Sequence, residues 1–312
     1  MDKPETISLY QFFKQFPDEN AARLYFENNR WGETKYCPHC GSVSVSECKD
    51  HKPMAYRCKD CRKHFSVRTG TVLEESKLPL QKWLMAIYMM TTARKGIPST
   101  QMARELGCTQ KSAWFLAQRI REAWLSGSAS DVGGGGKLGG TVEVDETFIG
   151  GKEGNKHASK RINKGRGAVG KAVVAGIKQR DGVVIAKRVP DTTAPVLQSF
   201  ITNNVARGST VYTDSASYYK SLRGYRHDTV NHSVGEYVKN QAHTNGIESF
   251  WALLKRSHYG IHHYMSHKHL HRYVNEAAFR HNTKKLGTMH FIDTTITQMN
   301  DRRLTYKELI RA

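Results

Sequence analysis

The sequence predicts a chain of several domains, in the mixed α+β and α/β classes, on three observations. Four of the six cysteines form two CxxC pairs, Cys37 with Cys40 and Cys58 with Cys61. A stretch rich in glycine and serine, residues 127–140, has no apolar periodicity. Beyond it, short alternating strands are followed by helical segments. At 312 residues the chain is long enough for two or three domains, each with its own core.

The composition of the chain is strongly basic. Its 48 Lys and Arg residues exceed its 28 Asp and Glu residues, so the formal net charge is +20 and the pI is near 9.7. A polyanion is therefore the expected partner, with nucleic acid first. The sequence contains no run of eighteen apolar residues, and its start lacks the apolar core of a signal peptide. We therefore expect a cytoplasmic protein with no membrane partner.

The first two segments are a helical stretch, residues 1–34, and a cysteine-containing module, residues 35–70. The two CxxC pairs have the spacing of two knuckles that close one tetrahedral zinc site. Short β-prone pieces lie between and after the pairs, so we expect a zinc ribbon of two or three strands with a structural Zn²⁺. His39, Cys48 and His51 are weaker alternative ligands, because the two pairs already complete the shell.

Residues 71–126 have a helical pattern that includes the spacing of a helix-turn-helix motif, with Gly107 as the turn residue. The second helix would present its first turn to DNA, through Gln110, Lys111 and Ser112. Arg119 is a further candidate for the same surface. An ordinary pair of antiparallel helices is the alternative, but the adjacent ribbon and the basic charge favour helix-turn-helix.

The glycine- and serine-rich stretch is a predicted flexible linker, which places a domain boundary before residue 141. Residues 141–285 open with TVEVDETFIGG, an alternating strand. This alternation puts Asp145 in the middle of the strand, with Glu143 on the same face and Glu146 on the opposite face. Residues 286–312 are predicted as a helical tail.

The order of elements in residues 141–285 is βββαβαβα, with the first three strands as an antiparallel meander. Asp214 ends the fourth strand, and a short fifth strand completes the sheet. This order, with acids on strands one and four, is the layout of the ribonuclease H-like fold, in which those two strands are neighbours. Asp145 and Asp214 should therefore meet and need a cation between them to offset their repulsion.

A third ligand is predicted from HTNGIESFWALLKR, residues 243–256. Glu248 and Lys255 share a helical face, with Asn245 one turn earlier. One interpretation is a capping box, in which Asn245 is the N-cap and Glu248 reaches back to it. The other is a metal nuclease, which needs a third oxygen ligand and a cation near the scissile phosphate. The residues alone leave both open.

Several blocks of sequence carry a family resemblance: DETFIGG, YTDSASYY, HTNGIESFW, the ribbon and FSVRTGTVLEESKLPLQKWL. Together they resemble bacterial insertion-sequence transposases of the DDE class with an N-terminal zinc ribbon, in the group related to Merlin elements. The resemblance implies a catalytic triad of Asp145, Asp214 and Glu248, followed by Lys255, with Mg²⁺ or Mn²⁺ as the catalytic ion. Some members have asparagine as the third residue, which here is Asn245. We favour Glu248, because a carboxylate binds Mg²⁺ better than a neutral amide.

The loop of residues 150–171 is rich in lysine and arginine, and we expect it to follow a DNA backbone beside the site. A solvated, disordered loop is the alternative reading without DNA. The residues assigned to DNA contact in this loop are Lys152, Lys160, Arg161, Lys164 and Arg166. The many histidines after residue 257 are predicted to pack or contact phosphate, because they form no closed ligand set.

The predicted function is a transposase that binds the ends of an insertion sequence and catalyses metal-dependent DNA cleavage and strand transfer. The resemblance further implies double-stranded DNA as partner, both terminal repeats and target, a homodimer or larger oligomer, and a nucleoid-associated bacterial protein. The alternative is a DNA-binding regulator whose nuclease-like domain is inactive or domesticated. A cellular ribonuclease H-type enzyme is a third reading, but it leaves the N-terminal modules unexplained.

Overall fold

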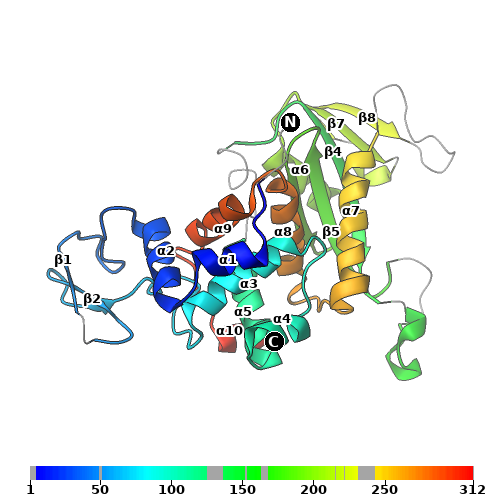
Figure 1. Cartoon of the computed structure of the whole chain (residues 1–312). Helices are drawn as coiled ribbons and strands as arrows, with labels where there is room; N and C mark the ends of the chain where they lie inside the picture. Colours follow the sequence, from blue (N-terminus) through cyan, green and yellow to red (C-terminus); the bar gives the residue numbers. More distant parts are fainter. Residues whose placement is uncertain are drawn as a thin grey trace. The chain divides into compact units, whose positions relative to one another are not determined.

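The computed structural model of the chain is shown in Figure 1. It describes residues 5–48, 51–124, 136–151, 153–162, 168–214, 216–220, 222–230 and 243–311. The chain divides into two compact units, and the C-terminal segment belongs to the first: Met1–Trp124 with Lys285–Ala312, and Leu125–Lys284. None of the helices that these described residues form is long and apolar enough to cross a membrane.

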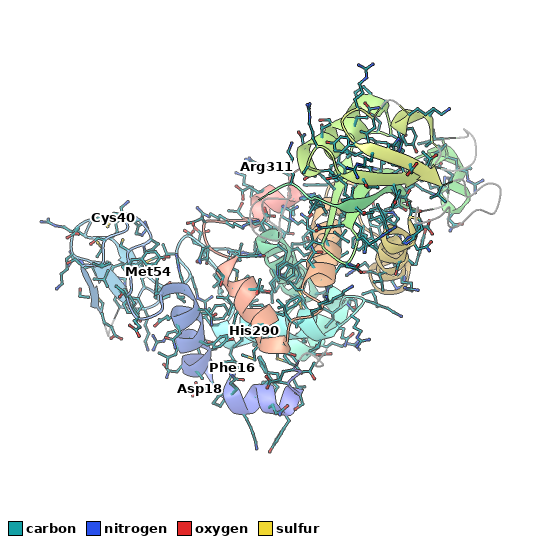
Figure 2. All side chains as sticks on the ribbon, turned by 90° about the horizontal axis from the view of Figure 1, so that it is seen from above. Phe16, Asp18, Cys40, Met54, His290 and Arg311 are labelled. Atoms are coloured by element: carbon teal, nitrogen blue, oxygen red, sulfur yellow. The ribbon has the colours of Figure 1, made fainter. Side chains whose placement is uncertain are left out.

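The first unit is mainly helical. Its helices are α1 (Leu9–Gln15), α2 (Glu19–Trp31), α3 (Leu80–Thr92), α4 (Ser99–Leu106), α5 (Gln110–Ala123), α9 (Thr288–Thr297) and α10 (Tyr306–Ile310). Helix α3 is central because apolar residues surround it, and Trp83, Ile87 and Met90 have no exposed surface. Helix α9, which carries His290, packs against α2 and α3 in spite of the sequence separation (Figures 1 and 2).

The cysteine-containing module forms a three-stranded antiparallel sheet, as predicted. Its strands are β1 (Val45–Glu47), β2 (Tyr56–Cys58) and β3 (His64–Phe65), in that order. The sheet is held to α2 by Tyr56, whose hydroxyl donates to buried Glu27 at 2.8 Å and whose ring meets Trp31 edge-on. Cys40 and Met54 mark this module in Figure 2.

Helices α4 and α5 are joined by a tight turn at Gly107. This residue ends α4 in the left-handed conformation, with φ 57° and ψ 52°, which favours glycine. Thr109 then caps α5 by accepting a hydrogen bond from the backbone N–H of Ser112. The prediction of Gly107 as the turn residue is confirmed.

The second unit is built on a five-stranded mixed sheet in the order β6-β5-β4-β7-β8. The strands are β4 (Thr141–Ile149), β5 (Ala172–Gln179), β6 (Val184–Val189), β7 (Thr210–Asp214) and β8 (Arg226–Val230). Strands β4, β5 and β6 form the predicted antiparallel meander. Strand β7 pairs in parallel with both β4 and β8, so the predicted neighbourhood of the first and fourth strands is confirmed.

Helices cover both faces of this sheet. Helix α6 (Ala194–Asn204) packs on the face that carries Val142 and Val144. Helices α7 (Asn245–Ser257) and α8 (Leu270–Asn282) pack on the other face, and a π-helical turn, η6 (His258–His262), continues α7. Figure 1 shows α7 lying along the sheet. The alternation of β4 therefore directs its odd-numbered residues toward α7.

Candidate active site

Three carboxylates meet where β4 and β7 lie side by side. The oxygen atoms that Asp145, Glu146 and Asp214 contribute all lie within 4.8 Å of one another. The parallel register pairs Thr141 with Thr210, and the same offset aligns Asp145 with Asp214 four residues further along each strand. The expectation that Asp145 and Asp214 meet is therefore confirmed, and the reason is the strand register.

Glu146 also belongs to this cluster, although the sequence predicted no role for it. Its carboxylate accepts a hydrogen bond from the hydroxyl of Tyr219 at 2.9 Å and another from that of Tyr218. Both tyrosines lie in the short 3₁₀ helix η4 (Ser217–Tyr219), which follows Asp214 closely. The adjacent acids in VDE and the paired tyrosines in SASYY are the signals that point to this network.

The electrostatics of the cluster favour a bound cation. Burial and the charges of Glu146 and Asp214 together raise the pKa of Asp145 to about 7, while the indole N–H of Trp251 opposes the shift. That N–H donates to Oδ2 of Asp145 at 3.0 Å. Burial also raises the pKa of Glu146. Hard oxygen donors that repel one another in this way fit a divalent cation such as Mg²⁺ or Mn²⁺.

Glu248 and Asn245 lie in the first turn of α7, and both are exposed. The close cluster of carboxylates found in the described residues does not include Glu248. Oε1 of Glu248 accepts a hydrogen bond from the hydroxyl of Thr244 at 2.8 Å. Thr244 is the N-cap residue, so the capping-box interpretation, which made Asn245 the N-cap, is wrong. Lys255 is exposed two turns further along the helix, on the face of Glu248.

The four predicted zinc ligands form a second cluster, in the first unit. All four sulfur atoms lie within 4.8 Å of one another, with 3.7 Å between Cys37 and Cys61 and 3.6 Å between Cys40 and Cys58. A tetrahedral zinc site with Zn–S bonds of about 2.3 Å requires sulfur separations of about 3.8 Å. A hydrogen bond from the backbone N–H of Cys61 lowers the pKa of the Cys58 thiol, which favours the thiolate that binds metal. The cluster fits a structural zinc ion.

Both clusters lie in parts of the chain that match known protein families. Residues 137–282 match the ISXO2-like transposase domain, and residues 17–64 match the transposase zinc-ribbon domain. This chain belongs to the insertion-sequence transposases. It is also similar to a curated protein of Halobacterium salinarum named as an uncharacterized protein in transposable element ISH50. The two are 28% identical over 260 residues, which cover 78% of this chain and 84% of that protein.

Three of the predicted DNA-contacting residues of the transposase lie at the start of α5. Gln110 and Lys111 are exposed, and Ser112 is half-buried. The ammonium group of Lys111 lies 4.6 Å from the centre of the Tyr306 ring, which comes from α10. The first turn of α5 is thus in contact with the C-terminal segment of the same unit.

Arg119 is not part of that exposed surface, and the prediction for it is wrong. The residue is only 5% exposed, and its guanidinium lies against the rings of Trp83 and Phe115, at 5.4 and 5.1 Å. It also donates a hydrogen bond to the backbone carbonyl of Glu74, and burial lowers its pKa to about 10. A guanidinium can pack on aromatic rings in this way, so charge alone did not predict its burial.

Part of the basic loop is described. Lys160 and Arg161 are exposed, and Arg161 donates hydrogen bonds to the backbone carbonyls of Lys156 and Gly154, at 2.9 and 2.8 Å. The remaining predicted residues of the loop lie outside the described residues: Lys152, Lys164 and Arg166.

The histidine-rich segment packs into the second unit. His258 is 3% exposed, and burial lowers the pKa of both His269 and His281 to about 4. The ring of His281 meets that of Phe250 edge-on, with 5.8 Å between centres. The side chains of His258, His269 and His281 act as packing groups that are neutral near pH 7.

Proposed function

We propose that this transposase binds the ends of an insertion sequence and cleaves and joins DNA strands by metal-dependent phosphoryl transfer in a ribonuclease H-like domain. The observation that carries the proposal is the meeting of Asp145 and Asp214 on adjacent parallel strands, within the matched transposase domain. The strand order and the helices on both faces agree with that fold. The proposed catalytic domain is residues 141–285.

Asp145, Asp214 and Glu248 are the proposed ligands of Mg²⁺ or Mn²⁺. When bound, the metal would activate the attacking water or 3′-hydroxyl and stabilise the leaving oxygen. Trp251 holds one carboxylate oxygen of Asp145, which keeps that side chain in one orientation. Lys255, exposed on the same helical face as Glu248, is proposed to contact a DNA phosphate near it.

Glu248 is proposed as the third ligand in preference to Asn245 and Glu146. A carboxylate is a better Mg²⁺ ligand than the amide of Asn245. The two oxygens of Glu146 already accept hydrogen bonds from Tyr218 and Tyr219, so we assign Glu146 to holding these tyrosines beside the site. Glu248 is exposed, so an ion or DNA can reach its carboxylate, whose Oε1 accepts from the hydroxyl of Thr244.

The first unit is proposed to recognise DNA. A zinc ribbon and a helix-turn-helix made of α4 and α5 would contact the terminal repeats, with Gln110 and Lys111 exposed for this purpose. The basic loop of the second unit would contact the backbone beside the catalytic site. Two element ends must be handled together, so we propose a homodimer or larger oligomer on DNA in the bacterial cytoplasm, associated with the nucleoid.

The test is Mg²⁺-dependent strand transfer of a labelled element end by the wild-type chain and by single variants. We expect Asp145→Ala, Asp214→Ala and Glu248→Gln to lose activity at least about 1000-fold while they still bind DNA. Asp228→Ala is the matched control, because Asp228 is an exposed acid on the neighbouring strand β8. It should keep activity.

Other outcomes separate the alternatives. Activity that survives Glu248→Gln but not Asn245→Ala would make Asn245 the third ligand. Sequence-specific DNA binding by a wild-type chain that cleaves no element end would favour the regulator. A preference for RNA–DNA hybrids over element ends would favour a cellular ribonuclease H-type enzyme.

A further inference from the structure

Glu143 is a buried acid with no place in the proposed chemistry. It lies on β4 two residues before Asp145, faces α7 and is 1% exposed. Its Oε2 accepts a hydrogen bond from the backbone N–H of Ile247 at 2.9 Å. This N–H lies in the first turn of α7, where a side chain of the N-cap residue is the usual acceptor. Thr244 makes no such capping bond, so a carboxylate from the sheet caps the helix instead.

Two basic side chains lie beside the carboxylate of Glu143 and stabilise it. Nε of Arg180 lies 3.8 Å from Oε1 of Glu143, and Nδ1 of His243 lies 3.4 Å from the same oxygen. The positive end of the helix dipole adds to this stabilisation. Gly246 leaves the space that the carboxylate occupies, because a Cβ there would lie 2.6 Å from Oε2 of Glu143. The start of α7 thus has room for an acid from β4, because Gly246 has no side chain.

A second bond ties the same two elements together. Trp251 donates to Asp145, and Ile247 donates to Glu143. The two donors are four residues apart on the helix, about 6 Å of rise. The two acceptors are two residues apart on the strand, about 6.7 Å. The two bonds hold α7 to β4 at two points, with Glu248 in the segment between them.

We propose that Glu143 is a positioning residue, which holds the first turn of α7 in place and thereby sets the position of Glu248 relative to Asp145. The inference rests on the proposed function in making Glu248 the third metal ligand. Glu143 would not touch the metal or the DNA. Its effect would reach the reaction through the helix alone.

The first experiment measures hydrogen exchange of backbone amides in the metal-free protein, for wild type, Glu143→Gln and Glu143→Ala. We expect amides 246–249 to exchange at least about 10-fold faster in Glu143→Ala, and Glu143→Gln to restore most of the protection because its amide oxygen can still accept from Ile247. The matched control is Glu276→Ala. Glu276 is a buried acid on α8 that pairs with Arg280 at 2.8 Å. Unchanged exchange at these amides in Glu143→Ala would overturn the proposal.

The second experiment measures single-turnover cleavage of a bound element end, with a double-mutant cycle. Glu143→Ala should slow cleavage about 10- to 100-fold at equal DNA binding, and adding it to Glu248→Ala should slow cleavage no further. If the fold-losses of the two single variants multiply in the double variant, Glu143 does not act through Glu248. If Glu143→Ala does not fold, Gly246→Ala is measured instead, because its Cβ displaces the Glu143 carboxylate without removing the charge.

The two arms separate this inference from the proposed function. If wild type cleaves no DNA, the proposed function fails, while the exchange experiment still decides whether Glu143 holds α7. If wild type cleaves DNA and Glu143→Ala cleaves it equally fast, only the positioning role fails.

Discussion

Gly176 is the residue on β5 that pairs with Asp145 on β4. A Cβ at this position would lie 2.6 Å from two ring atoms of Trp251 and 3.0 Å from Cδ1 of Ile247. The missing side chain therefore lets α7 approach the sheet closely enough for the indole to reach Asp145. Glycine is required here for close approach, a role that the alternating pattern of β5 does not reveal.

We predict that Gly176→Ala destabilises the second unit by about 1–3 kcal/mol, because the Trp251 ring must move away from the sheet. The same movement should break the bond to Asp145 and weaken metal-dependent cleavage. Urea unfolding followed by tryptophan fluorescence measures the first effect. The control is Gly139→Ala, whose Cβ would meet no other residue within 4 Å. Equal stability of the two variants would contradict the prediction.

At the scale of single elements, the zinc ribbon shows most clearly that short strands need support from outside their own sheet. Its three strands hold 2 or 3 residues each, too few to bury a core alone. Part of its support comes from α2, through Glu27 and Trp31. The rest would come from the metal, whose binding supplies folding free energy in modules of this size.

We predict that Cys58→Ser releases zinc and unfolds the ribbon, residues 35–70. Structural zinc contributes on the order of 10 kcal/mol in small modules, more than these short strands supply. Atomic absorption should find one zinc per wild-type chain and less than about a tenth of that in the variant. Cys48→Ser is the control, because Cys48 lies outside the sulfur cluster. Full zinc retention by Cys58→Ser would rule out the four-cysteine site.

Local sequence patterns predicted the elements of the second unit well. The period-two alternation of TVEVDETFI set the faces of β4, and the short gap between β5 and β6 set their antiparallel pairing. The meeting of Asp145 with Asp214 followed from strand order. The residues that the patterns missed depend on tertiary neighbours: Glu146 on two tyrosines, and Glu143 on a helix about a hundred residues away.

The local patterns also misassigned the start of α7 and the environment of Arg119. Asn245 is a good N-cap residue by type, but Thr244 occupies that position. Arg119 follows the helical period of a surface residue, but aromatic side chains from α3 and α5 enclose it. Periodicity specifies which face a residue occupies and does not specify what covers that face.

For the whole molecule, the division into units does not follow the order of the chain. The C-terminal segment, which the sequence predicts as a separate helical tail, completes the first unit. The indole N–H of Trp124 donates to the hydroxyl of Thr295 at 3.1 Å, and its ring meets Phe291 edge-on. Phe291 and Ile292 of α9 are both buried. Removing α9 would therefore uncover the core of this unit.

We predict that a chain ending at residue 284 keeps a folded second unit but loses the cooperative unfolding of the first. The loss of several buried side chains of α9 costs at least about 5 kcal/mol, comparable to the whole stability of a typical domain. Hydrogen exchange resolves the two units separately. The control chain ends at residue 301, so it keeps α9 and lacks α10. Native protection of α3 in the shorter chain would contradict the prediction.

The return of α9 to the first unit has a consequence for biosynthesis. A ribosome makes Met1–Trp124 before the second unit, yet the core of this segment is closed only after the five-stranded sheet and its helices have been synthesised. The first unit is therefore completed after the second unit. Translation that stops early would release a protein with its acidic residues in place but with its ribbon and α4–α5 pair on an incomplete support. Only products that include α9 would combine a complete first unit with the acidic site.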